Sequence, residues 1–354
     1  MTITPELKMV DVEEETEAIN IAVIGCGYWG INYVRLLSEL PETEVVAVCD
    51  LSDDRLQEVE RRFPGSELFN HIDDLLKLED LDAAVVCTNP ESHFEITSRL
   101  LKAGVHVLVE KPMTTTAEDS RKLIELAEEY DVKLMVGHIF LFNSGINMMK
   151  FYIDKGDVGQ IYYLHSRRTN LGPIRRDVNA IWDLAPHDVA IFNYLLDSSP
   201  EWVSAVGTKL LLNDREDAGF IVLGYPDNVL GHIHVSWADP NKERQLVLVG
   251  SDQRIAFDDL NLQDKLRVFE KGVTASANEP ASYGEYQLSI RNGDIISPQI
   301  TFSEPLKNQT RHFLEVIRDK VSPRTDGWNG LDVVKVMEAI DASLASNGAP
   351  VSIS

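Results

Sequence analysis

Basic residues are scarce in this sequence of 354 residues: 33 lysines and arginines stand against 57 aspartates and glutamates, a formal net charge of -24. A protein that binds duplex nucleic acid needs a basic face to displace the counterions of the phosphates. The charge balance therefore argues against nucleic acid as a partner and favours a soluble chain. It also means that an anionic substrate would need a pocket with a locally basic wall.

Cysteine is also rare, and long hydrophobic runs are absent. The three cysteines, Cys26, Cys49 and Cys87, fall near the ends of expected strands and lack the spacing of a metal site. Their odd number indicates a reducing compartment, where each acts as a small hydrophobic residue. No apolar run reaches the roughly 18 residues of a membrane span, and the first residues lack the layout of a signal peptide. We therefore expect a cytoplasmic protein with no membrane partner.

Apolar runs alternate with amphipathic stretches between residues 20 and 138. Continuous runs of Val, Ile and Ala are typical of parallel strands that are covered on both faces by helices. The sequence thus predicts a doubly wound α/β domain over residues 19–142, preceded by an acidic, disordered leader at residues 1–18. The expected strands are 21–24, 45–49, 83–87, 105–109 and 134–136, and the expected helices are 29–40, 52–62, 92–103 and 116–129.

The pattern changes after residue 150. Strand-like segments follow one another, and turn signals such as those at 226–228 and 250–252 separate several of them. Consecutive strands joined by short turns predict an antiparallel sheet, so we expect residues 143–354 to form an α+β domain with a mostly antiparallel sheet. The expected strands are 160–169, 201–212, 219–225, 229–237, 244–250, 253–257 and 265–269, and the expected helices are 144–155, 183–196, 308–320 and 328–346.

The segment GCGYWG at 25–30 follows the first expected strand and opens the first helix. Gly25 permits the tight turn, Gly27 lets the backbone approach a pyrophosphate, and Gly30 allows helix and strand to pack closely. The next strand ends at Asp50, where a carboxylate would accept hydrogen bonds from a ribose 2′-hydroxyl. Because that carboxylate would repel a 2′-phosphate, the sequence predicts NAD rather than NADP as the cofactor.

Two further positions carry groups suited to the oxidation of a hydroxyl. Lys111 follows the strand at 105–109, and the carboxyl ends of parallel strands border the ligand crevice of such folds. Its ammonium would stabilise the charge that develops on oxygen, or would itself accept the proton if desolvation lowers its pKa. Asp183 and His187 lie four residues apart and share one face of a helix. The imidazole can take a hydroxyl proton, and the carboxylate would orient the ring.

Three other histidines are weaker candidates. His138 follows the last strand of the first domain, where it would either line the crevice or be a hydrogen-bonded structural residue. His232 and His234 alternate along an expected strand and could pair as metal ligands. No third ligand accompanies them, so we expect no metal site.

The order of these motifs resembles the Gfo/Idh/MocA oxidoreductase family: GCGYWG at 25–30, CTNPESH at 87–93, EKP at 110–112 and DxxxH at 183–187. The likeness covers nearly all of the chain from residue 20. It implies a Rossmann domain followed by a domain with an open-faced antiparallel sheet. It also implies that Lys111, Asp183 and His187 are catalytic, with His187 as the base. The expected cofactor-binding residues are Gly25, Gly27, Tyr28, Trp29, Gly30, Asp50, Thr88, Asn89, His93, Glu110 and Lys111.

The chain departs from the family pattern at two places. Asn89 stands where the family commonly has proline, and Ala185 stands where it has glycine. Neither change removes a reactive group, but both leave the local geometry open.

A narrower likeness covers residues 167–172 and 179–188. This stretch resembles family members that oxidise nucleotide-activated amino sugars at C3, such as UDP-N-acetylglucosamine or UDP-N-acetylglucosaminuronate 3-dehydrogenases. Guanidinium groups suit phosphate and carboxylate oxygens, and side-chain amides can bind sugar hydroxyls. The residues expected to contact the substrate are Arg168, Asn170, Arg175, Arg176, Asn179 and His187.

We therefore predict an NAD-dependent dehydrogenase that transfers hydride between nicotinamide and a secondary hydroxyl, at C3, of a nucleotide-activated amino sugar. A keto-sugar reductase and a polyol or inositol dehydrogenase of the same family are alternatives. A non-catalytic NAD-binding regulatory protein is a third, although the presence of Lys111 and His187 argues against it. An open sheet face usually needs covering, so we expect a homodimer or homotetramer.

Overall fold

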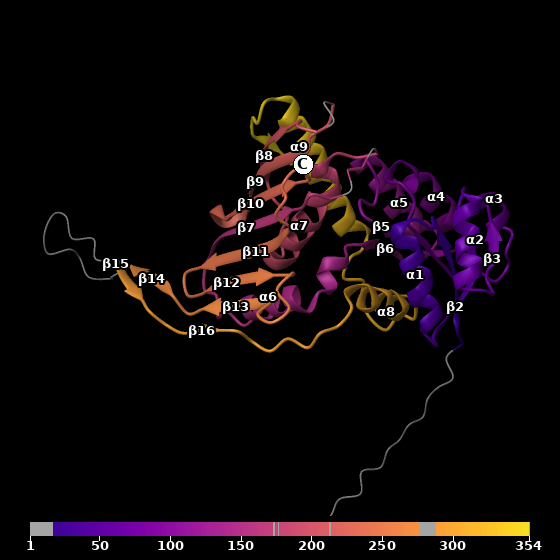
Figure 1. The fold of residues 1–354 in the computed structure, drawn as a ribbon, viewed down its shortest axis with the longest axis horizontal. Helices are drawn as coiled ribbons and strands as arrows, with labels where there is room; N and C mark the ends of the chain where they lie inside the picture. Colours follow the sequence, from indigo (N-terminus) through magenta and orange to yellow (C-terminus); the bar gives the residue numbers. More distant parts are fainter. Residues whose placement is uncertain (1–16, 173, 176, 212–213, 276–287, 354) are drawn as a thin grey trace, which may run out of the picture.

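The computed structural model describes residues 17–172, 174–175, 177–211, 214–275 and 288–353. Of the predicted leader, residues 1–16 lie outside this range, as does Arg176. Figure 1 shows two bodies next to each other, a smaller sheet wrapped by helices and a large sheet formed by the following half of the chain. A two-stranded hairpin, β14 (Gly272–Ala275) and β15 (Leu288–Arg291), extends away from the large sheet.

The first sheet is parallel throughout, in the order β3-β2-β1-β4-β5-β6. This order reverses direction between β1 and β4, and ligands of such sheets bind at that reversal, outside the carboxyl ends of the strands. The GCGYWG segment lies there because it directly follows β1. The predicted Rossmann domain is confirmed, with strands β1 (Ile19–Ile24), β2 (Thr43–Cys49), β3 (Glu67–Phe69), β4 (Ala83–Val86), β5 (His106–Glu110) and β6 (Leu134–Gly137).

Helices cover both faces of this sheet, as the continuous apolar strands require. Val23 belongs to the hydrophobic core on one face and its neighbour Ala22 to the core on the other, and both are fully buried. Side chains alternate along a strand, so burial of successive residues means burial of both faces. The helices are α1 (Tyr28–Glu39), α2 (Asp53–Arg62), α3 (Ile72–Leu75), α4 (Pro90–Lys102) and α5 (Ala117–Glu129).

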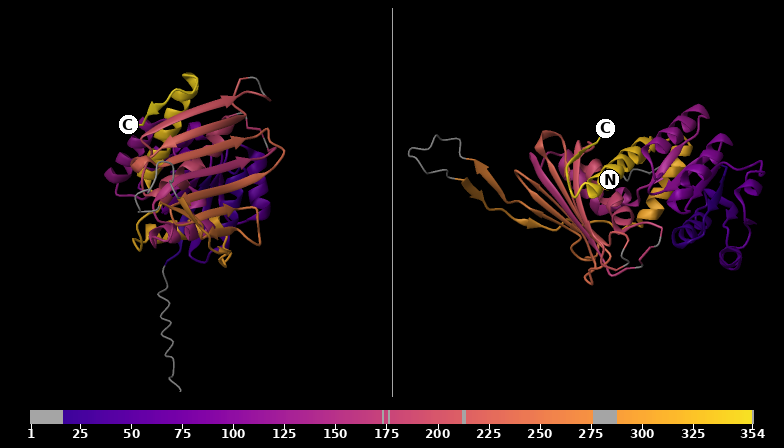
Figure 2. Two further views of the ribbon diagram at one scale, coloured as in Figure 1. Left: turned by 90° about the vertical axis from the view of Figure 1, so that its left-hand side faces the viewer. Right: turned by 90° about the horizontal axis from the view of Figure 1, so that it is seen from above.

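The second sheet has the order β16-β13-β12-β11-β7-β10-β9-β8-β17, and β7 and β10 are its one parallel pair among the described strands. The predicted mostly antiparallel sheet is confirmed. Figure 2 shows that helices cover one face and leave the other open. The strands are β7 (Ile161–Thr169), β8 (Trp202–Thr208), β9 (Ala218–Gly224), β10 (Leu230–Ser236), β11 (Glu243–Gly250), β12 (Arg254–Asp258), β13 (Leu266–Phe269), β16 (Ile295–Ile296) and β17 (Val351–Ser352).

The remaining helices connect the two bodies or cover the large sheet: η1 (Ile139–Phe142), α6 (Ser144–Asp154), α7 (Ala180–Leu196), η2 (Pro226–Asn228), α8 (Pro305–Ile317) and α9 (Gly327–Ala345). Helix α9 packs against α5 and β6 of the first domain and against β8 of the second. The chain therefore returns to the first domain near its end, and the domain boundary at residue 142 stays a prediction. Within the described residues, no helix is long and apolar enough to cross a membrane.

Candidate active site

A cavity of about 2150 Å³ lies between the two domains. Its wall combines the glycine turn after β1 and the carboxyl ends of β2, β4 and β5 with residues from β7, α7 and the segments after β10 and β12. Lys111 from the first domain and His187 from the second both line it. The structure thus brings the predicted ammonium and imidazole into the same cavity as the predicted dinucleotide turn.

Glycine is required at two positions of the turn for packing alone. Gly25 has a φ of +89°, and a Cβ there would lie 2.8 Å from the backbone nitrogen of Thr88. A Cβ on Gly30 would lie 1.8 Å from the carbonyl oxygen of Gly25. Gly27 differs, because the nearest atom to its Cβ would be Nη1 of Arg55, at 3.8 Å. The space beside Gly27 opens into the cavity, where a pyrophosphate would approach the backbone.

Asp50 is buried at the end of β2 and lines the cavity. One carboxylate oxygen accepts a hydrogen bond from the backbone of Cys26 at 2.6 Å, and the other accepts one from Ser52 at 2.9 Å. A carboxylate has about four acceptor sites, so it can still take a ribose hydroxyl. The turn, the open space at Gly27 and this carboxylate fit NAD, and the cavity wall next to them includes Tyr28, Trp29, Thr88 and Asn89.

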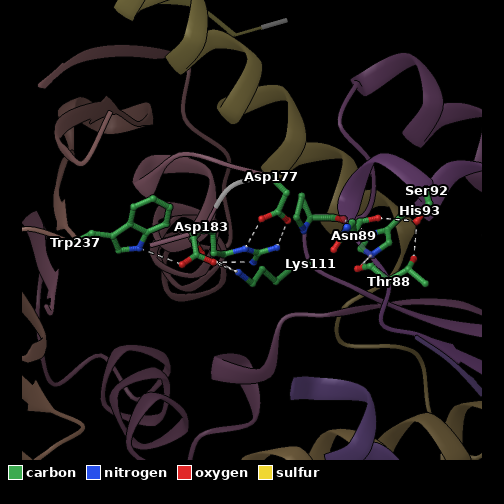
Figure 3. Close-up of polar contacts among 10 residues, drawn as sticks. Thr88, Asn89, Ser92, His93, Lys111, Asp177, Asp183 and Trp237 are labelled. Carbon is green, nitrogen blue, oxygen red and sulfur yellow. Dashed lines mark hydrogen bonds and ion pairs between the residues drawn. The ribbon is translucent and has the colours of Figure 1, made fainter. Parts of the chain in front are cut away.

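Lys111 leaves the end of β5 and reaches across to α7. Its Nζ donates to the carbonyl oxygen of Asp183 at 2.7 Å and lies 3.5 Å from a carboxylate oxygen of the same residue. Burial lowers the pKa of Lys111, and the negative charges of Asp183 and Glu110 oppose this shift. In Figure 3, Lys111 and Asp183 face each other, with Trp237 beyond Asp183. The ammonium is therefore fixed in place by a partner in the other domain.

Glu110, the residue before Lys111, is buried on the cavity wall. Its Oε1 accepts a hydrogen bond from the hydroxyl of Tyr33 at 2.9 Å. Burial raises the pKa of Glu110. The buried pair ties the end of β5 to α1, so it helps to fix the base from which Lys111 extends.

Asp183 binds three donors other than the predicted histidine. Its carboxylate accepts from Arg175 at 3.0 Å and from the indole of Trp237 at 3.4 Å, besides its contact with Lys111. Nδ1 of His187 is buried and has no hydrogen-bond partner among the described residues. The prediction that Asp183 orients the ring of His187 is therefore wrong in this structure. Sharing one helix face brought the two residues near each other, but stronger cationic donors occupy the carboxylate.

His187 lies among cations. Burial is the largest cause that lowers its pKa well below the ordinary value, and the charges of Lys111, Arg168 and Arg244 add to it. The ring of Phe140 packs edge-on against the imidazole, with centroids 5.1 Å apart. The imidazole is consequently neutral near pH 7 and can accept a proton.

The predicted anion-binding arginines already have carboxylate partners. Arg168 is buried and forms two hydrogen bonds with Asp188, at 2.9 and 3.0 Å, while its guanidinium stacks on Phe140 at 4.2 Å. Arg175 donates to Asp177 and to Asp183, each at 3.0 Å. Both arginines line the cavity. These bonds use two of the five N–H groups of Arg168 and three of those of Arg175, so the charge of each guanidinium is paired with a carboxylate of the chain.

The other predicted contact residues divide between the cavity and the framework. Asn170 lines the cavity. Asn179 does not, because it caps α7: its side-chain oxygen accepts from Trp182 at 2.8 Å and its amide donates to Glu216 at 2.9 Å. An asparagine just before a helix is the usual sequence signal of such a cap.

His93 lies behind the cavity wall. Its two ring nitrogens lie 2.8 Å from the carbonyl oxygen of Pro112 and 3.0 Å from that of Thr88, and the ring is fully buried. His93 therefore joins the backbone of the β4 end to the backbone after Lys111. In Figure 3 it lies beside Thr88 and Ser92, on the far side of Lys111 from Trp237.

His138 is also buried, and neither ring nitrogen has a partner among the described residues. Burial and the charge of Lys111 lower the pKa of His138 to about 3. His232 and His234 lie on β10, and His234 stacks on Phe220 with centroids 4.4 Å apart. In the part of the chain that the structure describes, no group of three His, Cys, Asp or Glu residues could hold a metal ion.

Sequence reasoning missed one wall of the cavity. The residues of this wall come from β11, from the position just before it and from the segment after β12: Arg244, Lys242, Asp259 and Lys265. The two basic residues Lys242 and Arg244 stand at the start of an expected strand, a signal present in the sequence. The sequence does not show that β11 lies next to β7, because three other strands separate the two along the chain.

In comparison with known proteins, the two halves of the chain match two separate family models. Residues 19–138 match the model of the Gfo/Idh/MocA oxidoreductase family with an NAD-binding Rossmann fold, and residues 146–256 match the model of its C-terminal domain. The first description confirms the predicted NAD cofactor and the predicted NAD-dependent dehydrogenase class.

Individual relatives differ in what they act on. A 2,7-anhydro-N-acetylneuraminate hydratase of Mediterraneibacter gnavus is 22% identical over 319 residues, which cover 86% of this chain and 84% of the relative. Inositol 2-dehydrogenase 2 of Saccharopolyspora erythraea is 30% identical over 226 residues, covering 61% and 66%. The crystal structure of the WlbA dehydrogenase from Bordetella pertussis, in complex with NADH and UDP-GlcNAcA, superposes with a TM-score of 0.78 at 22% identity, covering 96% of this chain and 99% of that one.

The matches to both halves, the parallel sheet with its glycine turn, and the cavity between the domains agree with one another. The chain belongs to the Gfo/Idh/MocA family of NAD-binding oxidoreductases.

Proposed function

We propose that this chain transfers hydride between NAD and the C3 hydroxyl of a nucleotide-activated amino sugar, with Lys111, His187 and Asp183 as its catalytic residues. The observation that carries the chemistry is the convergence of Lys111 and His187 on the cavity that also contains the glycine turn and Asp50. A cation and a neutral imidazole at one site suit a reaction in which a hydroxyl loses a proton as a hydride departs. Support for the sugar class comes from the sequence likeness and from the UDP-sugar complex of the Bordetella protein.

The proposed roles follow from the surroundings of each group. NAD, when bound, supplies the acceptor for the hydride. His187 removes the hydroxyl proton at Nε2, since Nδ1 is buried and the lowered pKa keeps the ring neutral. Lys111 stabilises the oxygen as it becomes negative, and Asp183 fixes the position of the ammonium through its carbonyl oxygen at 2.7 Å. Lys111 as the proton acceptor is the alternative, which its own lowered pKa supports.

Substitution of each group tests this scheme. Lys111→Met and His187→Asn should each lower kcat by roughly 10²–10⁴-fold, the usual contribution of a positioned acid or base. The measurement is NADH absorbance with a panel of UDP-sugars, free sugars and polyols. Lys133→Met, a change at a partly exposed lysine paired with Asp319, is the matched control and should leave turnover unchanged. Full turnover by both active-site variants would exclude the proposed chemistry.

An inositol or polyol dehydrogenase is the second candidate, because the Saccharopolyspora relative has that activity. The two candidates differ in the need for a nucleotide. UDP alone should raise the thermal midpoint of this protein if the substrate is a UDP-sugar, since a ligand that binds only the folded state stabilises it. Oxidation of myo-inositol together with no effect of UDP would favour the polyol. A keto-sugar reductase uses the same residues, and the direction depends on the substrate and cofactor pools.

We further propose a cytoplasmic homodimer or homotetramer. Cys26 and Cys49 are buried and all three cysteines are unpaired, which suits a reducing compartment. The open face of the large sheet supports association with a second copy, because exposed apolar side chains continue across neighbouring strands on that face.

A further inference from the structure

Two arginines of like charge lie opposite each other on the cavity wall. Strand β11 pairs with β7 in antiparallel register, and Arg244 is the direct partner of Arg168. Directly paired residues project from the same face of a sheet, and both of these side chains line the cavity. Like charges in this arrangement repel each other unless each has a counter-ion.

The counter-ions are unequal. Arg168 is paired with Asp188 through two hydrogen bonds of 2.9 and 3.0 Å between buried groups. The carboxylate nearest to Arg244 in the described chain is Asp259, 3.8 Å from Nη1. Asp259 also lies 3.4 Å from Nζ of Lys265. Two cations thus share Asp259. With Lys242, this wall has three cations against two lining carboxylates, Asp259 and Asp264, which is a surplus of positive charge.

The other contacts of these residues do not neutralise the surplus of positive charge. Asp259 further accepts a hydrogen bond from Asn143 at 3.0 Å, so part of its acceptor capacity is used. Lys242, two residues before Arg244 and just ahead of β11, also lines the cavity. The pKa of Arg244 is lowered, first by burial and then by Arg168, which agrees with a cation that lacks a full partner. The chain as a whole carries a net charge of -24, so this wall opposes the overall field.

We propose that Arg244, with Lys242 and Lys265 beside it, binds an anionic group of the substrate, either a phosphate or a carboxylate. The ligand then supplies the counter-ion that Asp259 supplies only in part. This inference rests on the proposed function and gives its substrate a required negative charge. It also moves the anion site from Arg168 and Arg175, whose charges are paired with Asp188, Asp177 and Asp183, to a wall that sequence reasoning did not find.

The substrate is favoured over the cofactor as the source of the anion. The three cations belong to the second domain, whereas the glycine turn and the start of α1 in the first domain suit the cofactor pyrophosphate. Arg244 pairs directly with Arg168 and lines the same cavity as Lys111 and His187. Tyr28 of the glycine turn lines that cavity as well, so a cofactor phosphate is the rival source of the anion that the test has to separate.

Direct binding measurements on Arg244→Gln test the proposal without turnover. The probes are UDP for the phosphate, D-glucuronate for the carboxylate, and NAD for the rival source, each titrated by calorimetry. We expect affinity for UDP or for glucuronate to fall tenfold or more, with the affinity for NAD unchanged. Arg244→Lys, which keeps the charge, should retain most of the affinity. Arg167→Gln is the matched control, since Arg167 precedes Arg168 on β7, points to the opposite face and pairs with Glu243 at 2.8 Å.

Each other outcome overturns the proposal. A loss of NAD affinity in Arg244→Gln would assign the arginine to the cofactor, and unchanged binding of both anions would remove it from the site. Failure of both anions to bind the unchanged protein would also exclude the anion subsite. The thermal midpoint without ligand should not fall in Arg244→Gln, because the change removes a repulsion, and this separates lost binding from lost folding. Because these are binding measurements, loss of the anion subsite is read separately from the proposed hydride transfer, which the Lys111 and His187 variants test by turnover.

Discussion

Among the residues of the cavity, His187 has surroundings that oppose protonation from several sides. Burial and three cations lower its pKa, so the neutral form persists to a lower pH than in free histidine. If this imidazole is the base, kcat/KM should stay high as the pH falls through the ordinary histidine pKa of 6.5 and should decline only at a lower pH. The measurement is kcat/KM against pH with saturating NAD.

An acidic decline centred at 6.5 or above would contradict this assignment. The His187→Asn variant is the control, because a decline that persists in it belongs to another group. A basic decline would report loss of the proton from Lys111, whose pKa is lowered by burial. The acidic and the basic decline of kcat/KM together would then show which residue accepts the hydroxyl proton.

Reactive groups could be found from the sequence, but their partners could not. Lys111 and His187 lie in short motifs whose spacing is local, and the structure places both on the cavity. The partner of Arg168 is Asp188, one residue after His187, and only the packing of α7 against β7 brings the two together. Arg244 was missed for the same reason, since its position depends on which strands are neighbours.

At the scale of elements, two glycines in the turn between β1 and α1 have different roles: Gly30 is needed for packing and Gly27 for binding. A Cβ at Gly30 would overlap the carbonyl oxygen of Gly25, at 1.8 Å, so Gly30→Ala should force α1 away from the sheet and lower the thermal midpoint. Gly27→Ala meets no atom closer than 3.8 Å and should fold normally. It should nevertheless lose NAD affinity by at least tenfold, because the added methyl occupies the space into which the pyrophosphate fits.

The comparison of these two variants requires both the thermal midpoint and NAD affinity by calorimetry. Gly104→Ala measures the cost of a positive φ alone, since its φ is +79° and a Cβ there meets nothing within 4 Å. Normal NAD affinity in Gly27→Ala would contradict the placement of the pyrophosphate at this turn.

Long elements were predicted closely, and short ones were not. Continuous apolar strands such as β1 and β4 bury both faces, which leaves an unmistakable pattern in the sequence. Strand β3 has three residues and α3 has four, too few for either period to show. Helix α7 begins at Ala180, three residues before its predicted start, because Asn179 caps it. The predicted strand 201–212 ends at Thr208, and residues 212–213 lie outside the described range.

At the scale of the whole molecule, α9 holds the two sides of the cavity together. Its N-cap Asp326 accepts a hydrogen bond from Asn329 at 2.9 Å and bridges to Met135 of β6, while the helix continues to β8 of the large sheet. Gly330 packs so closely on Val136 that a Cβ would lie 2.7 Å from its side chain. The last helix therefore fixes the position of one domain against the other, which the order of elements along the sequence does not reveal.

The open face of the large sheet leads to a prediction about assembly. Phe220 and its register partner Val206 are 46% and 50% exposed, and a second pair on the next two strands, Leu230 and Tyr163, is 44% and 45% exposed. Figure 2 shows this face without covering helices. Burial of these side chains against a second copy would remove them from water, so we expect a dimer or a larger assembly by light scattering.

Phe220→Glu tests which surface makes that contact. A carboxylate in the centre of a buried apolar face is costly to desolvate, so the variant should shift the protein toward the monomer while circular dichroism stays unchanged. Tyr130→Glu, at a tyrosine that is 41% exposed beyond the end of α5, is the matched control and should leave the assembly intact. A Phe220→Glu protein with the original mass would mean that the sheet face stays open to solvent. The cavity lies on the other side of this sheet, so loss of the assembly should leave NAD affinity unaltered.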